Sequence, residues 1–289
     1  MVDFAGREEV VRRVSEALVT AGSTFSEDKV RAYERAIAME TNPRAKWALE
    51  TILENGRVAA HNRSPLCDDT GIPHLLLEVG RDRAVTGATI EAIREGVREG
   101  LRALPGRPMA IMGNDWQRID QSGGLDQDPG ALESAPLLTI SSEEPGRLRL
   151  HVLMFGGGPA IRGKTYRVFH RHSAETVKDE IVDWAIQSVA QLGCSPCTLT
   201  IGIGRSHYEA AAMMLQAQAF GNHDIQSEAE SEITRRVNAA GIGALGLRGD
   251  ISVLSTFLKI GPQRASGVRI VCLRPSCCFE PRHGYTDLP

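Results

Sequence analysis

Apolar side chains recur at helical spacing through the first part of the chain. Val10 and Val14 fall on one face of a helix, and the segments "RAYERAIAME" and "RAKWALETILENGRVAA" repeat the same amphipathic pattern. Pro43 and Pro65 interrupt the pattern, because proline lacks the N–H group that a helix interior needs. The spacing therefore predicts that residues 1–63 are helical.

From residue 64 onward the pattern alternates between strands and helices. Compact apolar runs bounded by turns predict strands, and apolar positions three and four residues apart predict helices. The predicted strands are 74–80, 136–140, 147–155 and 197–204, followed by a strand-rich C-terminal section. The predicted helices are 88–104, 177–192 and 206–217. Residues 113–146 are rich in Asp, Gly, Ser and Pro and predict a long loop around one short strand.

These elements predict a mixed α/β fold in a single domain that spans residues 1–289. Its helical N-terminal part, residues 1–63, is expected to pack on a mixed β-sheet region formed by residues 64–289. The chain contains no internal repeat and no low-complexity tract.

Composition and charge are those of an ordinary globular protein. Of the 289 residues, 42% are hydrophobic and 24% are charged, and the formal net charge is −3. This balance gives no sign of a nucleic-acid or membrane partner. No apolar run approaches the ~20 residues of a membrane span, and the N-terminus lacks the apolar core of a signal peptide. We therefore expect a cytoplasmic protein whose six cysteines are thiols, ligands or core residues rather than disulfides.

Three cysteines lie where the chain changes direction. Cys67 lies in a turn, Cys194 just after a predicted helix, and Cys278 near the C-terminus. Cysteines in turns can reach a common centre from distant parts of a sequence, and three convergent thiolates suit an iron–sulfur cluster with one open iron. No short ligand motif covers the three, so their spacing alone is weak support. Cys272 lies in an apolar strand and is expected in the core.

Cys194 and Cys197 also form a C-x-x-C pair, which occurs in redox proteins and in zinc sites. A redox pair of the thioredoxin type needs a strand before the motif and a helix after it, and here a helix precedes and a strand follows. No second C-x-x-C completes a zinc site. Both functions stay open as distant alternatives.

Several segments could orient an anionic or polar substrate. Asp68 and Asp69 follow Cys67 and offer acid/base chemistry, although aspartates in such a turn also bond their own backbone. The segment "FGGGPAIRGKTYR" offers backbone N–H groups next to cations, as in an anion nest or a plain loop. In "IGIGRSHYE" a glycine turn leads into a capped helix, whose N-terminus favours an anion.

The segment "ETNPRAKWALETILENGRVAAHNRSPLCDDTGIP" resembles the start of the iron–sulfur-dependent class I fumarase and L(+)-tartrate dehydratase family. In that family the turn reads P-L-C-Q-D-T-G or P-L-C-D-D-T-G. Further similar segments follow in the family's order: "LPGRP", "GGGPA", "CSPCTLTIGIGRSHYEAA" and "CFEPRH". The last resembles C-W-A-x-R-R, which selects Cys278 over Cys277. The resemblance covers residues 35–285 and is weakest at 110–150.

The resemblance implies a domain like the α part of class I fumarases, with a [4Fe–4S] cluster held by Cys67, Cys194 and Cys278. An open iron would act as a Lewis acid on a departing hydroxide. The implied activity is that of a hydro-lyase on a small hydroxy-carboxylate, such as fumarate/malate or tartrate. Asp69 is the implied catalytic residue, and the implied substrate-binding residues are Asp68, Asp69, Thr70, Arg107, Gly157 and Gly158.

The chain departs from the family's pattern at positions expected near the substrate. Phe155 stands where a lysine precedes the glycines, Asp250 replaces a usual lysine, and Arg264 stands close to the place of an expected histidine. Two alternatives therefore stay open: a stand-alone diverged lyase with another substrate, and a cluster-binding subunit without catalysis.

The resemblance also concerns partners. In the resembling enzymes a β part supplies the catalytic base and further cations, and this chain ends where the family's α part ends. We therefore expect a separate β subunit and a homo- or hetero-oligomer. A small dicarboxylate or hydroxy-carboxylate is the expected ligand, with no nucleic acid and no membrane.

Overall fold

The computed structural model describes residues 4–104 and 106–289, which divide into two compact units. Unit 1 contains the residues up to Thr24 together with Arg57–Phe155 and Arg282–Pro289, and unit 2 contains Phe25–Gly56 and Gly156–Pro281. Each unit is thus built from stretches that are far apart in the sequence. The prediction of one domain over residues 1–289 stays a prediction, since this division concerns compactness only.

Unit 1 is a four-stranded mixed sheet covered by helices. Its strand order is β2-β1-β3-β8, with β1 parallel to β2 and antiparallel to β3. Strand β8 pairs antiparallel with β3. The strands are β1 (Ile72–Gly80), β2 (Leu138–Ser142), β3 (Leu148–Phe155) and β8 (His283–Asp287), and the principal helices are α1 (Phe4–Ser23) and α4 (Gly87–Ala103).

Helices α1 and α4 pack closely because α4 presents glycines to α1. A Cβ atom at Gly96 would lie 2.6 Å from the Cβ of Val14 and 2.8 Å from the carbonyl oxygen of Val11. Apolar side chains of both helices, including Val14 and Leu18, share one core with the sheet residues Leu77 and Leu150. The helical spacing of the first residues therefore reflects burial against α4 and the sheet.

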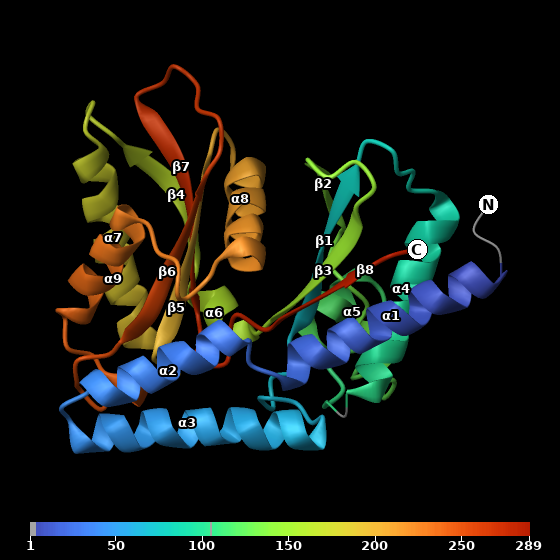
Figure 1. The fold of residues 1–289 in the computed structure, drawn as a ribbon, viewed down its shortest axis with the longest axis horizontal. Coiled ribbons are helices and arrows are strands. Elements are labelled where there is room, and N and C mark those ends of the chain that lie inside the picture. Colours follow the sequence, from blue (N-terminus) through green and yellow to red (C-terminus); the bar gives the residue numbers. More distant parts are fainter. Residues whose placement is uncertain (1–3, 105) are drawn as a thin grey trace. The chain divides into compact units, whose positions relative to one another are not determined.

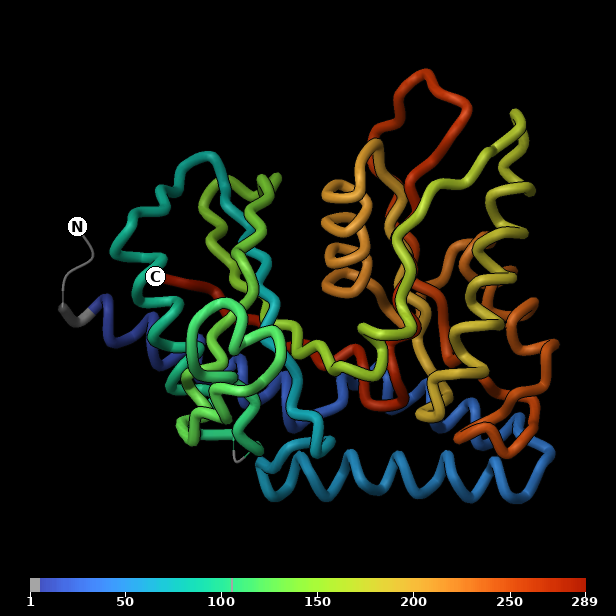
Figure 2. Tube along the Cα trace, turned by 180° about the vertical axis from the view of Figure 1, so that it is seen from behind, coloured from blue at the N-terminus to red at the C-terminus, as the bar shows by residue number. Residues whose placement is uncertain are grey.

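Unit 2 is a second four-stranded mixed sheet, with strand order β4-β7-β5-β6. Figures 1 and 2 show helices α7 and α9 on one face of this sheet and α8 on the other. The strands are β4 (Lys164–Phe169), β5 (Cys197–Gly204), β6 (Val253–Ile260) and β7 (Val268–Ser276). The helices are α2 (Glu27–Met39), α6 (Gly157–Arg162), α7 (Ala174–Leu192), α8 (His207–Phe220) and α9 (Glu228–Asn238). Helix α3 (Pro43–Asn62) runs through the boundary at which the two units are divided.

The glycines of "IGIG" let α8 lie directly on β5. A Cβ atom at Gly202 would stand 2.1 Å from the carbonyl oxygen of Ala210 and 2.2 Å from the backbone nitrogen of Met214. Ser206 caps α8, because its side chain accepts a hydrogen bond from the backbone N–H of Glu209. The glycine turn that leads into a capped helix is thus confirmed.

The predicted fold class is confirmed as mixed α/β, with the first 62 residues of the chain forming α1, α2 and α3 where the structure describes them. The loop prediction for residues 113–146 was partly wrong. This stretch contains helix α5 (Asp115–Asp120) and a 3₁₀ turn (Pro129–Leu132) as well as β2. Asn114 and Gln117 form a capping box at the start of α5. The helix was missed because its six residues are too few to show a helical period. No helix in the described part of the chain is long and apolar enough to cross a membrane.

The contact between α1 and α4 predicts that Gly96→Ala destabilises the fold. Alanine favours a helix interior over glycine by about 1 kcal/mol, but its Cβ would collide with Val14. We expect the free energy of unfolding to fall by about 1–3 kcal/mol, as in other overpacked cores. Chemical denaturation measures the change.

The matched control is Gly87→Ala, at the start of the same helix. No heavy atom lies within 4 Å of a Cβ placed there, so this variant should unfold at the same or a higher denaturant concentration. Equal destabilisation of both variants would contradict the role of the α1–α4 contact.

Candidate functional site

The turn that carries Cys67 lies in unit 1, between α3 and β1. The backbone N–H of Leu66 donates to the carbonyl oxygen of Gly22 at 2.9 Å, which fixes the start of the turn. Gly71 ends it with φ = 90°, where a Cβ atom would lie 3.0 Å from the carbonyl carbon of Phe155. Glycine is required here both for this left-handed conformation and for the close backbone approach. Cys67 itself is partly exposed.

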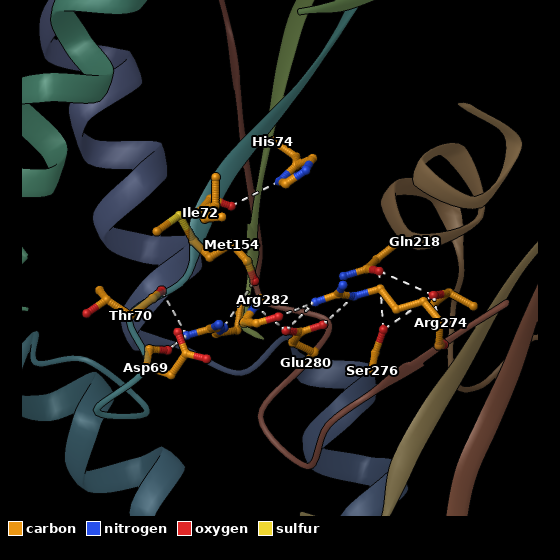
Figure 3. A network of polar contacts seen from close by, with 12 residues as sticks. Asp69, Thr70, Ile72, His74, Met154, Gln218, Arg274, Ser276, Glu280 and Arg282 are labelled. Carbon is orange, nitrogen blue, oxygen red and sulfur yellow. Dashed lines mark hydrogen bonds and ion pairs between the residues drawn. The ribbon is translucent and has the colours of Figure 1, made fainter. Parts of the chain in front are cut away.

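The buried side chain of Arg282 binds the backbone of the Cys67 turn. Its Nη1 donates to the carbonyl oxygens of Asp69 at 2.7 Å and Thr70 at 2.9 Å, and its Nε donates to that of Met154 at 3.1 Å. Figure 3 shows the guanidinium directed at the Asp69–Thr70 turn. The side chain is buried, with 1% of the residue exposed. A planar fork of donors suits such a set of carbonyl acceptors, so Arg282 fixes the backbone on which the predicted substrate residues stand.

The side chains of the turn differ in what they contact. Asp68 is exposed and lies 3.5 Å from a guanidinium nitrogen of Arg107, which is itself half exposed. An exposed ion pair of this kind contributes little stability, and Arg107 stays accessible to an anion. The hydroxyl of Thr70 is buried next to Gly106 and has no hydrogen-bond partner among the described residues. A buried unsatisfied hydroxyl calls for an explanation, and a bound ligand is one.

Cys194 and Cys278 come together in unit 2. The backbone N–H of Cys278 donates to the carbonyl oxygen of Cys194 at 2.8 Å, although the two residues are far apart in the sequence. Cys194 is exposed and Cys278 is buried. A hydrogen bond with Cys277 and burial raise the pKa of the Cys278 thiol, and the neighbouring Cys194 adds to this rise. The structure thus places two of the three predicted ligands side by side.

The glycine run is tied to the same C-terminal loop. Glu280 is fully buried, and its carboxylate accepts from the backbone N–H of Gly156 at 2.6 Å and from Arg274 at 3.0 Å. Arg274 also donates to the carbonyl oxygen of Gly156 at 3.0 Å. Figure 3 shows Arg274 and Glu280 facing each other. Gly157 and Gly158 follow as exposed residues at the start of α6, so the plain loop, one of the two alternatives for this segment, is wrong.

The other cysteines occupy the positions expected of them. Cys272 is buried in β7, as predicted for a core residue. Helix α7 ends before Cys194 and β5 begins at Cys197, which is the reverse of the arrangement in a thioredoxin-type redox pair. Burial raises the pKa of the Cys197 thiol. A thiol in that state is a poor nucleophile, so a redox role for this pair is disfavoured.

The three positions that depart from the family pattern have their own surroundings. Phe155 is buried at the end of β3 and stacks on His74, with 4.2 Å between ring centroids. Asp250 accepts from the backbone and the hydroxyl of Thr41, and these bonds lower its pKa. Arg264 is exposed in the loop between β6 and β7. Phe155 and Asp250 thus take part in local packing and hydrogen bonding.

Sequence reasoning missed Arg282, Arg274 and Glu280 as residues of the site. The available signal was the presence of charged residues in an apolar C-terminal section, "VRIVCLRPSCCFEPRH". Their partners are mainly backbone groups, which leave no mark in a sequence. Their role could therefore not be predicted from residue types alone.

The predicted cluster ligands are divided between the two units. Cys67 belongs to unit 1, and Cys194 and Cys278 belong to unit 2. Within the described residues, no three side chains of His, Cys, Asp or Glu are grouped in a way that could hold a metal ion. Within the described residues the six cysteines form no disulfide. Thiol side chains on loops, as at Cys67, Cys194 and Cys278, fit the ligand type of an iron–sulfur cluster.

The chain is similar in sequence to known proteins over most of its length. It is 26% identical over 272 residues to a protein of Methanocaldococcus jannaschii that carries the provisional name L(+)-tartrate dehydratase subunit alpha, covering 90% of this chain and 92% of the other. It is 22% identical over 294 residues to the L(+)-tartrate dehydratase subunit alpha of Escherichia coli, covering 98% and 93% of the two chains.

A sequence model of the fumarate hydratase (Fumerase) family matches residues 11–286. This match spans the turn of Cys67, the glycine run and the tail with Cys278, and it confirms the resemblance seen in the sequence. The chain therefore belongs to the fumarate hydratase (Fumerase) family of hydro-lyases.

Proposed function

We propose that the chain is the cluster-bearing α subunit of an iron–sulfur-dependent hydro-lyase that acts on a small hydroxy-carboxylate such as malate or tartrate. The observation that carries this proposal is the family match over residues 11–286. The names of the relatives add the α-subunit assignment and tartrate as a substrate of those proteins. The backbone hydrogen bond between Cys278 and Cys194 supports the proposal that both are ligands of the same cofactor.

In this proposal Cys67, Cys194 and Cys278 hold a [4Fe–4S] cluster. When bound, the cluster would supply a Lewis-acidic iron for the departing hydroxyl group of the substrate. Cys278 lies in a loop fixed by its bond to Cys194 and by the buried Glu280. A preorganised loop lowers the cost of ordering a ligand when the cofactor binds.

The residues of unit 1 would bind and orient the substrate. Arg107 is accessible and carries donors that match a carboxylate. Asp69 would orient the substrate or handle a proton, on a backbone that Arg282 holds in place. Asp68 and the Thr70 hydroxyl would complete the polar contacts. In unit 2 the exposed backbone at Gly157 and Gly158 would contact the anion.

A partner completes the proposal. The relatives are named as alpha subunits, so we propose that a β subunit joins this chain in a hetero-oligomer and supplies further catalytic groups. The test is an anaerobic assay of the iron- and sulfide-reconstituted chain with L-malate, fumarate and tartrate isomers, alone and with a family β subunit. We expect turnover of one of these only with the partner. A cluster-loaded complex that converts none of them would contradict the hydro-lyase assignment for these substrates.

The role of Arg107 predicts a defect in substrate affinity. In Arg107→Gln the guanidinium–carboxylate contact is lost, which is worth about 1.5–3 kcal/mol for a charged hydrogen bond. We expect KM to rise about 10–100-fold, while kcat changes little. Arg94→Gln, an equally exposed change on α4, is the control and should leave KM unaltered. Steady-state kinetics measure both values, and an unchanged KM in Arg107→Gln would remove this residue from the substrate site.

The position of Arg282 predicts a different kinetic signature. Lysine keeps the charge in Arg282→Lys but cannot span the three carbonyl oxygens that Arg282 contacts. A small displacement of the Asp69 turn should lower kcat by about a hundredfold and leave the iron content intact. Arg149→Lys, which breaks the paired contacts with Asp287 at 2.8 Å, should retain normal kcat. A full kcat in Arg282→Lys would show that the turn needs no such support.

A further inference from the structure

Helix α2 directs two buried polar side chains at the loop that carries Cys278. The Nζ of Lys29 donates to the carbonyl oxygen of Glu280 at 2.7 Å. One turn later, the hydroxyl of Tyr33 donates to the carbonyl oxygen of Cys278 at 2.7 Å. Both residues are fully buried, each with 0% of its surface exposed. Two side chains four residues apart thus hold the same loop from one helix face.

A buried lysine is an unfavourable choice for a side chain that only holds a loop by one hydrogen bond. Burial of an ammonium group removes it from water at a large desolvation cost, and lysine is almost never fully buried in proteins. The ring of Phe25 lies 4.5 Å from the Lys29 nitrogen, which offers partial compensation through a cation–π contact. Tyr33 shows that an uncharged donor can anchor this loop. The charge of Lys29 therefore calls for a role beyond the hydrogen bond.

The residues around Lys29 show which part of the molecule its charge is close to. The Glu280 carboxylate is bonded to Gly156 and Arg274, and Lys29 contacts this residue at its carbonyl oxygen. Cys278 is two residues away and is bonded to Cys194 through the backbone. The Lys29 nitrogen and the Tyr33 hydroxyl thus contact the two ends of the segment 278–280 inside the protein. A charge in a buried setting acts more strongly on its neighbours than a charge in water.

We infer that Lys29 supplies a buried positive charge that stabilises the anionic thiolate-ligated cluster at Cys278. This inference rests on the proposed cluster. Three thiolates outweigh the charge of a resting [4Fe–4S] core, so the bound group carries net negative charge. A fixed cation beside it should strengthen its retention and raise its reduction potential, since net charge and hydrogen bonding near the sulfurs set that potential. Lys29 is thus a positioning and tuning residue that need not touch the substrate.

The test compares Lys29→Gln with Tyr33→Phe in the reconstituted chain. Each variant alters one contact between α2 and the Cys278 loop, but only Lys29→Gln removes a charge, and glutamine can still donate. We expect iron release to a chelator to be about tenfold faster in Lys29→Gln, with a reduction potential below that of the wild type by EPR-monitored titration. Tyr33→Phe should keep the wild-type potential and release iron within about threefold of the wild-type rate.

Circular dichroism of the cluster-free proteins checks that the variants fold. If Lys29→Gln does not fold, Lys29→Met, which keeps the length of the side chain, takes its place. Equal behaviour of Lys29→Gln and Tyr33→Phe, or a wild-type potential in Lys29→Gln, would overturn the role of the charge and leave the cluster proposal standing. Failure of the wild-type chain to bind a cluster would instead overturn the proposed function, and this inference with it.

Discussion

Buried cations that bind backbone carbonyl oxygens are the constraint on which the loops of the candidate site depend. Arg282 binds the carbonyls of the Cys67 turn in unit 1, while in unit 2 Arg274 binds that of Gly156 and Lys29 that of Glu280. All three side chains are buried. A charged hydrogen bond contributes about 1.5–3 kcal/mol, and its loss inside a protein costs more because a buried group is left unsatisfied. Strands are held in place by regular backbone hydrogen bonds, which these loops lack. The three buried side chains hold the loop backbone instead.

This arrangement separates two tasks within short stretches of sequence. In "LCDDTG" the backbone carbonyls of Asp69 and Thr70 are occupied by Arg282, whereas Asp68 is exposed beside Arg107. In the tail, Cys278 carries a thiol for the proposed cluster while its backbone is fixed on both sides. Residues that must hold a cofactor or substrate are thus kept in place by atoms other than those that do the chemistry. Such support is a general requirement of precise sites.

Much of the fold could be predicted from the sequence because its signals are local. The stripe of Val177, Ile181 and Val189 on α7 follows helical periodicity, and the glycine turn of "IGIG" before a capping serine predicts the start of α8. Helix α5 was not predicted because a six-residue helix is too short to show a helical period. Arg282 was missed because its acceptors are carbonyl oxygens 128 to 213 residues away along the chain, and any residue type provides such an oxygen. Contacts between a side chain and a distant backbone group therefore cannot be predicted from a pattern of residue types.

The cluster is the central claim, and its stoichiometry is the most direct measurement. The chain would be purified without oxygen, reconstituted with iron and sulfide, and assayed chemically for both and by EPR, together with alanine variants of single cysteines. The account predicts about four irons per wild-type chain, lost in Cys67→Ala, Cys194→Ala and Cys278→Ala and kept in Cys197→Ala and Cys277→Ala. Absence of a cluster, or zinc bound through Cys194 and Cys197 instead, would contradict it.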